Sequence, residues 1–233
     1  EPGKFSEVIG IVKQGIQLNV LTDDAEVPAA LNDAARAADV CLSVFLKIDC
    51  GYHRCGVSPD SPEAFAIPAF IQNSSNLRFA GILTHAGHSY HAESVDGIRE
   101  IARIERDSMV ALAEKLRANG IDVPCVSIGS TPTISHVDHL DGIDEIRPGN
   151  YIFFDAFQAT LGSCGFDDCA LTVLAAVTHR SREQQKIIVD AGAIALSKDR
   201  GAVDIDKNCG YGRVLDLDGN DLGLRIDSLS QEH

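Results

Sequence analysis

The chain has 233 residues, of which 45% are apolar and 23% charged, and it carries a formal net charge of −14 at pH 7. This composition is typical of a globular protein, and the negative charge argues against nucleic acid or an anionic membrane as a partner because both would repel the chain. No apolar run reaches about 18 residues, which argues against a membrane span, and seven cysteines without a CxxC pair indicate free thiols in a reducing, cytoplasmic compartment.

Strand-like and helix-like segments alternate in the first part of the chain, up to about residue 157. Apolar residues at helical spacing separate the strands, and the longest such stretch, 95–120, ends at Gly120. This alternation indicates parallel βα units covered on both faces. Runs rich in Val, Ile and Leu predict five strands, at about 18–22, 42–49, 78–87, 123–130 and 145–155.

The length of this alternating part falls short of a closed barrel. A (β/α)8 barrel needs roughly 200 to 250 residues, whereas the alternation covers only residues 1–157. The difference corresponds to about three strands with their helices. The sequence therefore predicts an α/β fold in which residues 1–157 form the later strands of a partial (β/α)8 TIM barrel.

The pattern changes at about residue 160. Strand-like runs are now separated by Gly and Asp turns, with no helical stretch expected between them. We predict an incomplete, antiparallel β domain over residues 158–233. The runs lie at 171–180, 185–197, 211–219 and 221–230.

Polar clusters follow the predicted strands of the first part. In barrels of this kind the loops after the C-terminal ends of the strands form the active site. We therefore expect four separate loops to meet at one rim. They contain residues 53–54, 84–91, 129–133 and 147–151.

Two of these loops are suited to a phosphate group. Gly129 leaves backbone amides accessible, and Ser130 and Thr131 supply hydroxyl groups. The same residues would serve equally well as a Ser/Thr turn that caps a helix. In the next loop Gly149 permits close approach of the backbone and Arg147 adds a positive charge. Together the two loops favour a phosphorylated ligand.

Three histidines recur at every third position: His85, His88 and His91. On a helix they would lie near one face, and imidazole is a common metal ligand. Gly87 and Ser89 argue against a regular helix here. A stacking or hydrogen-bonding role for His85 is therefore favoured over a metal site.

Arg54 follows the second predicted strand and has two interpretations. It is either a structural arginine paired with Asp49 or Glu63, or a guanidinium that holds a phenolate or carboxylate through two parallel hydrogen bonds. Among the lysines, Lys47 is the better candidate for a buried amine, although a salt bridge would explain it as well. Lys198 lies among turn residues, where lysines are usually solvated.

These clusters, in this order, resemble the fold-type III pyridoxal-phosphate enzymes, and within them the D-serine dehydratase and D-threonine aldolase branch. Five ordered matches are far more specific than any one of them. The matching segments are KIDCGYHRCG (47–56), GILTHAGHSY (81–90), SIGSTPT (127–133), EIRPGNYIFFDA (145–156) and VDAGAIALSKD (189–199).

The resemblance implies a role for each matching residue. Arg54 is expected to hydrogen-bond the phenolic oxygen of pyridoxal 5′-phosphate, and His85 to pack against its ring. Tyr90 is expected near the cofactor, and Arg147 to address the pyridine nitrogen. The residues expected to hold the phosphate are Gly129, Ser130 and Thr131, helped by Gly149, Asn150 and Tyr151.

The family pattern also includes two features that this chain lacks. The lysine that forms the Schiff base belongs to the first barrel strand of the family, and no residue here matches it. The divalent metal of this branch, zinc or manganese, is held by a His-x-Cys or His-x-Asp pair that is likewise not found, so no metal ligand is assigned. We expect the chain to be an internal piece of a longer enzyme and to be inactive alone.

The resemblance implies a lyase acting on a small D-amino acid with a β-hydroxyl group, by D-serine dehydration or D-threonine aldol cleavage. The alternatives are an amino acid racemase of the alanine racemase type and a non-catalytic carrier of pyridoxal phosphate. The racemases also imply a homodimer. The choice between D-serine and D-threonine stays open at this point.

Overall fold

Contacts within the chain divide the computed structural model, which describes residues 2–233, into two compact units. The first comprises the chain up to Ser89 together with Arg99–Pro148, and the second comprises Tyr90–Ile98 together with Gly149–His233. The predicted domain division between residues 157 and 158 stays a prediction.

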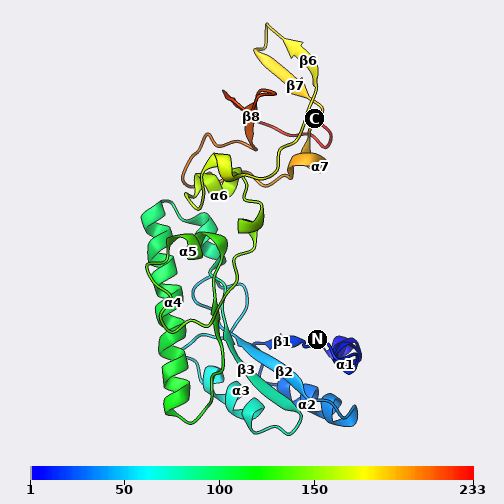
Figure 1. Ribbon diagram of the computed structural model, residues 1–233, viewed down its shortest axis with the longest axis vertical. Helices are drawn as coiled ribbons and strands as arrows, with labels where there is room; N and C mark the ends of the chain where they lie inside the picture. The colour runs from blue at the N-terminus through cyan, green and yellow to red at the C-terminus, as the bar shows by residue number, and fades with distance from the viewer. Residues whose placement is uncertain (1) are drawn as a thin grey trace. The chain divides into compact units, whose positions relative to one another are not determined.

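The first unit contains a parallel sheet of five strands in the order β1-β2-β3-β4-β5. Each strand overlaps a range predicted from the sequence, and Figure 1 shows β1, β2 and β3 running side by side. The expected parallel α/β architecture is therefore confirmed. The strands are β1 (Asn19–Thr22), β2 (Leu42–Lys47), β3 (Leu77–Leu83), β4 (Val126–Ile128) and β5 (Glu145–Ile146).

The fifth strand is much shorter than the predicted run of 145–155. It ends at Ile146, and the amide of Arg147 makes one further hydrogen bond to the carbonyl of Ile128. The partner strand β4 has itself ended at Ile128, and Ser130 already caps a helix, so the ladder has no further partner. A 3-10 helix, η3 (Asn150–Ile152), follows in the second unit, and the strand prediction is wrong over this part.

The helices that accompany the strands have amphipathic sequences, and α2 and α3 pack against β3. The predicted end of the long helix is confirmed, because α4 stops two residues before Gly120, which adopts a φ of +77°. No helix within residues 2–233 has the length and apolar character that crossing a membrane requires. The helices are η1 (Pro2–Lys4), α1 (Phe5–Lys13), α2 (Val27–Ala37), α3 (Glu63–Gln72), η2 (Gly87–His91), α4 (Val95–Ala118) and α5 (Thr131–His136).

The hydrophobic core of the first unit surrounds the central strands. All six residues of β2 are buried, and the alternate residues Leu42, Val44 and Leu46 pack into the core that the helices share. Helices α2, α3 and α4 each contribute an apolar stripe to one continuous cluster. Its fully buried members include Leu46, Ile67, Ile82, Met109, Leu112 and Ile128.

The second unit contains two antiparallel hairpins, which confirms the predicted change to antiparallel β structure. The expectation that no helix separates the strands is wrong. All four residues of the run Ala-Ile-Ala-Leu are apolar, and so short an apolar run fits a strand and a helical turn equally. The chain forms a turn of helix there, α7 (Ala193–Leu196). The elements are α6 (Ala156–Thr160), η4 (Phe166–Asp168), β6 (Val177–Ser181), β7 (Lys186–Val189), α7 (Ala193–Leu196), β8 (Arg213–Leu215) and β9 (Asp221–Arg225).

Candidate functional site

A cavity of about 450 Å³ opens at the C-terminal ends of the sheet strands. Residues at the end of each of the five strands, or just after it, line the cavity, as expected for a ligand site in a barrel of this family. Four residues singled out from the sequence are among them: Arg54, His85, Gly129 and Arg147. The other lining residues are Leu21, Thr22, Asp23, Lys47, Cys55, Leu83 and Thr84.

The loop after β2 is built around the carboxylate of Asp49. Oδ1 accepts hydrogen bonds from the amides of Gly51 and His53, at 2.9 and 3.0 Å, and Oδ2 lies 3.0 Å from Nδ1 of His53. Partial burial acts to raise the pKa of Asp49, but the two backbone hydrogen bonds and the His53 side chain outweigh it and lower that pKa. The loop then returns to the strand, where the amide of Asp49 donates to the carbonyl of Val57.

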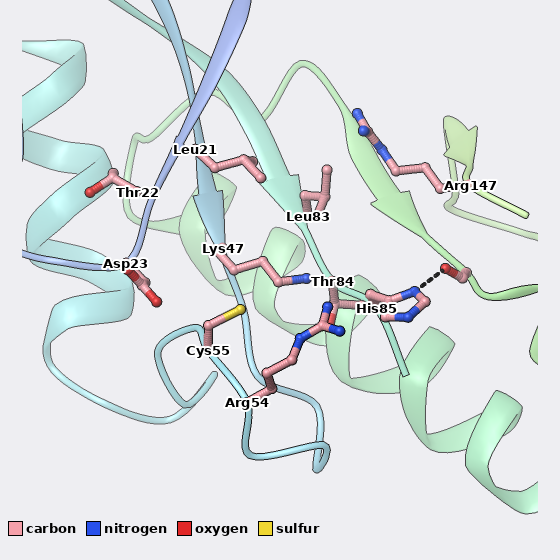
Figure 2. A pocket seen from close by; sticks show the side chains of 11 residues that line it. Leu21, Thr22, Asp23, Lys47, Arg54, Cys55, Leu83, Thr84, His85 and Arg147 are labelled. Atoms are coloured by element: carbon pink, nitrogen blue, oxygen red, sulfur yellow. Dashed lines mark hydrogen bonds between the residues drawn. The ribbon is translucent and has the colours of Figure 1, made fainter. Parts of the chain in front are cut away.

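Asp49 is therefore engaged by its own loop and does not pair with Arg54. Among the described residues neither Asp49 nor Glu63 forms an ion pair with Arg54, so the structural interpretation of this arginine is not realised. Its guanidinium lies over the ring of Tyr52, 4.9 Å from the ring centroid. Figure 2 shows the Arg54 guanidinium and the Lys47 amine pointing toward the same space beside Thr84 and His85.

Lys47 is the last residue of β2, and its side chain is 8% exposed. No carboxylate in residues 2–233 pairs with it, so the salt bridge considered from the sequence is not formed. Burial, aided by the positive charge of Arg54, lowers the pKa of Lys47. Two cationic side chains without a carboxylate partner thus face one cavity, in a chain that is strongly acidic.

His85 follows β3, and its Nδ1 atom donates a 3.0 Å hydrogen bond to the carbonyl oxygen of Gly129, drawn as the dashed line in Figure 2. This bond places the proton of the neutral ring on Nδ1. The ring of Tyr52 meets His85 edge-on, with centroids 6.3 Å apart, and stacks on His88 at 6.2 Å. Gly87 is needed for this packing because a Cβ atom there would overlap the Tyr52 ring.

The three histidines do not converge on a metal site. The stretch from Gly87 forms a 3-10 helix, which confirms that the glycine and serine interrupt a regular α-helix. His85 bonds to the backbone, His88 stacks on an aromatic ring, and His91 lies 3.4 Å from Asp204 within the second unit. In the part of the chain that the structure describes, no group of three or more His, Cys, Asp or Glu side chains is placed to hold a metal ion.

The loop after β4 forms a helix cap. Gly129 has a φ of +116°, and Ser130 is the N-cap of α5, with its hydroxyl accepting from the amide of Thr133 and its amide donating to the Thr133 hydroxyl. Ser130 and Thr131 are each only 1% exposed. The capping role considered from the sequence is therefore present for Ser130.

Arg147 lines the cavity in a paired state. Its guanidinium contacts Oε1 of Glu145 at 2.6 and 2.7 Å, and its Nε donates to the hydroxyl of Ser127 at 2.8 Å. The Ser127 hydroxyl in turn donates to the same carboxylate oxygen at 2.6 Å. Sequence reasoning did not identify Ser127 or Glu145 as partners of this arginine. Their alternation along neighbouring strands β4 and β5, at positions paired in register, is the signal that would have indicated them.

Glu105 is a second residue that sequence reasoning missed. It lies in α4 and is 1% exposed, and its Oε1 accepts from the amides of Ala86 and Gly129. The sequence does contain a signal. Glu105 occupies a position at helical spacing between Ala102 and Met109, on the apolar stripe of the helix.

The remaining predicted residues belong to the second unit, as do their described contacts. The ring of Tyr90 lies 5.8 Å from that of Phe157, and the Asn150 amide donates to Asp155 at 2.7 Å. Tyr151 is 53% exposed. Gly149 precedes η3 with a φ of −104°, which any residue can adopt.

Two family models match the chain. Residues 6–156 match the model described as the alanine racemase N-terminal domain, and residues 170–233 match the putative serine dehydratase domain. Because the first model alone matches well over half of the chain, the chain belongs to the alanine racemase N-terminal domain family, the fold-type III group of pyridoxal-phosphate proteins. The resemblance seen in the sequence motifs is therefore confirmed.

Individual relatives agree with this assignment. The D-threo-3-hydroxyaspartate dehydratase of Delftia sp. (strain HT23) is 36% identical over 234 residues, covering 100% of this chain and 61% of the relative. The D-serine dehydratase of Dictyostelium discoideum is 37% identical over 245 residues, covering 99% and 61%. The chain thus spans about three fifths of the length of these curated relatives.

Solved structures show the same fold. The Delftia dehydratase has a TM-score of 0.93 at 36% identity, covering 100% of this chain and 62% of that one. The D-threonine aldolase from Filomicrobium marinum has a TM-score of 0.77 at 24% identity, covering 100% and 60%. At that identity the aldolase supports the fold alone.

Proposed function

We propose that this chain is part of a pyridoxal-phosphate-dependent lyase that acts on D-amino acids with a β-hydroxyl group. The dehydratases of Delftia and Dictyostelium, at 36 and 37% identity, support this reaction class. The match of residues 170–233 to a serine dehydratase domain favours a lyase over a racemase, and also over a carrier that consists of a barrel alone.

The observation that carries the proposal is the state of Arg54 at the cavity. Its guanidinium lies over Tyr52 and leaves hydrogen-bond donors for a ligand. Beside it lie the oriented ring of His85 and the Lys47 amine, which pairs with no carboxylate of residues 2–233. A cavity of about 450 Å³ with this donor set fits an anionic aromatic ligand of the size of pyridoxal phosphate.

When bound, pyridoxal phosphate supplies an electron sink for negative charge developing on the substrate α-carbon. In our assignment Arg54 donates to the phenolic oxygen, and His85, with Nδ1 committed to Gly129, packs its ring against the cofactor. Arg147 addresses the pyridine nitrogen. A positive side chain there disfavours protonation of that nitrogen and so weakens the electron sink.

The phosphate assignment, and the assignment of Tyr90 to the surroundings of the cofactor, follow the match of the sequence motifs to the family. What supports the loop after β4 is the place of Gly129, with its positive φ, in the lining of the cavity. The residues proposed to hold the phosphate are Gly129, Ser130, Thr131, Gly149, Asn150 and Tyr151.

Four further features of the protein are proposed on the same basis. A lysine for covalent attachment of the cofactor and a zinc or manganese site are proposed for the whole protein, and no residue of this chain, which spans 61% of the relatives' length, is assigned to either. One solved variant of a D-threo-3-hydroxyaspartate dehydratase is described as metal-free, which supports a metal in that relative. A domain division between residues 157 and 158 and a homodimeric assembly are also proposed, the latter testable by analytical ultracentrifugation.

The reaction is tested on the full-length protein supplied with pyridoxal phosphate and either Zn²⁺ or Mn²⁺. We expect pyruvate and ammonia from D-serine, or oxaloacetate and ammonia from D-threo-3-hydroxyaspartate, with the L-enantiomers as controls. Glycine and acetaldehyde from D-threonine would instead indicate aldol cleavage within the same class. Conversion of D- to L-alanine without any of these products would contradict the lyase assignment.

A further inference from the structure

A buried carboxyl group lies behind the cavity, on the apolar face of α4. Glu105 is 1% exposed, and its neighbours along this face, Ala102 and Met109, are 1% and 0% exposed. A carboxyl group at such a position is costly unless it is well hydrogen-bonded. The partners of Glu105 therefore indicate why a carboxyl group occupies this place.

The partners are the two loops that carry cavity residues. Oε1 of Glu105 accepts from the amide of Ala86 at 2.9 Å and from the amide of Gly129 at 3.1 Å. Ala86 directly follows β3 and His85, and Gly129 directly follows β4. The hydroxyl of Thr133 is close enough to lower the pKa of the carboxyl, but it donates to the Ser130 carbonyl, and Oε2 has no hydrogen-bond partner within residues 2–233.

These two hydrogen bonds close a ring of contacts with His85. The His85 Nδ1–H donates to the carbonyl of Gly129, whose own amide donates to Glu105. Glu105 also holds the amide of the residue that follows His85. The hydrogen bond from His85 to Gly129 sets the orientation and tautomer of the imidazole. Oε1 of Glu105 holds the backbone at both ends of that bond, at Ala86 next to His85 and at Gly129 itself.

We propose that Glu105 is a positioning residue that, through Oε1, fixes the loops after β3 and β4 and so holds His85 in its Nδ1–H tautomer at the cavity. The link to cofactor affinity rests on the proposed function, whereas the link to His85 does not. A residue needed only to fill the core would be replaceable by an apolar side chain of the same size, and that difference makes the proposal testable.

The test compares two substitutions of similar volume in the full-length protein. E105Q keeps a carbonyl acceptor for the two amides, whereas E105M fills the same space without one. Two quantities are measured: the tautomer of His85, from long-range ¹H–¹⁵N spectra of the ligand-free protein, and pyridoxal phosphate affinity by equilibrium dialysis. M109A serves as the matched control, because Met109 lies one turn further along the same face and contributes to the core.

We expect E105Q to keep the Nδ1–H tautomer and an affinity within about threefold of the unsubstituted protein. E105M should give a mixture of tautomers and about tenfold weaker binding, because two backbone amides lose their acceptor. M109A should lower the thermal midpoint without changing the tautomer. An E105M protein that matches E105Q in the tautomer, or an M109A protein that loses it, would overturn the proposal.

A substitution that fails to fold is replaced by E105D, which keeps the carboxyl group but is one methylene shorter. Reach to both amides then fails, and we expect the tautomer to become mixed; an unchanged tautomer would count against the proposal. Failure of the unsubstituted protein to bind pyridoxal phosphate would count against the proposed function alone, since the tautomer is measured without ligand.

Discussion

The guanidinium of Arg54 lies 4.9 Å from the centroid of the Tyr52 ring, which also meets His85 edge-on and stacks on His88. A cation held over an aromatic face is oriented without using its N–H donors, so those donors stay available to an anionic ligand. The same ring joins the loop after β2 to the loop after β3. Tyr52 therefore organises the side of the cavity at which we place the phenolic oxygen of the cofactor.

Replacing Arg54 tests this arrangement. R54M should weaken pyridoxal phosphate binding by the full-length protein about tenfold or more, because hydrogen bonds to charged groups contribute roughly 1.5–3 kcal/mol. R54K should recover part of the loss, since a lysine keeps the charge but not the planar pair of donors. The control is R36M, which removes an exposed ion pair with Asp33. Binding by R54M equal to that of R36M would contradict the assignment.

The two glycines that the sequence suggested for phosphate contact differ in the structure. Gly129 has a φ of +116°, and a Cβ atom there would lie 2.7 Å from Cγ1 of Ile134. Gly149 has a φ of −104°, with no atom within 4 Å of such a Cβ. G129A should therefore cost roughly 1–3 kcal/mol of unfolding free energy in urea titrations. G149A should change it by less than about 0.5 kcal/mol, and equal losses would show that the backbone at Gly129 is not strained by a side chain.

The strands could be predicted because their apolar runs are continuous and lie between helices with clear periodicity. The contact of Arg54 with the Tyr52 ring could not be predicted from the sequence. Asp49 is near it in sequence, but its oxygens are occupied by the amides of Gly51 and His53, a loop conformation that composition does not specify. The turn of helix at Ala193–Leu196 was missed because a run of four apolar residues fits a strand as well as a helical turn.

The contacts of Glu105 were hidden for a different reason. They join residues 19 and 24 positions apart, from α4 to the loops after β3 and β4. Only the packing of the helix against the sheet brings these atoms together. A carboxyl group on an apolar helix face can be noticed in the sequence, but its partners depend on the assembled fold.

Cysteine reactivity offers a test of the cavity that does not depend on turnover. Cys41 and Cys55 are exposed, and Cys55 lines the cavity. Burial raises the pKa of Cys50 to about 11, which leaves little thiolate at pH 8. Iodoacetamide at pH 8, followed by peptide mass spectrometry, should label Cys41 and Cys55 and spare Cys50.

Pyridoxal phosphate should then protect Cys55 selectively. A ligand in the cavity blocks access to that thiol, while Cys41 lies outside the cavity and reports on the reagent itself. We expect the Cys55 labelling rate to fall at least about fivefold at saturating ligand, as the free fraction of sites decreases. Equal rates with and without ligand would place the cofactor elsewhere.

The buried carboxyl of Glu105 predicts a pH dependence of stability. Burial raises its pKa above the ordinary value of 4.5, against the opposing hydrogen bonds from the amides of Gly129 and Ala86. The folded state therefore binds the proton more tightly than the unfolded state does. The stability associated with this protonation is present below the unfolded pKa and is lost as the pH rises through the folded pKa. E105Q carries no such proton, so its free energy of unfolding should exceed that of the unsubstituted protein by more at pH 8 than at pH 5.

Glu100, on the same helix, provides a control because its pKa is shifted in the opposite direction to that of Glu105. It is exposed, and the hydrogen bond from Arg103 lowers its pKa, so E100Q removes a favourable contribution that is present at neutral pH. Because solvent screens an exposed pair, this effect should be small. Urea titrations of both variants at pH 5 and pH 8 separate the two cases. If the difference between E105Q and the unsubstituted protein were independent of pH, Glu105 would have the same pKa folded and unfolded, and the carboxyl would not be buried as the structure places it.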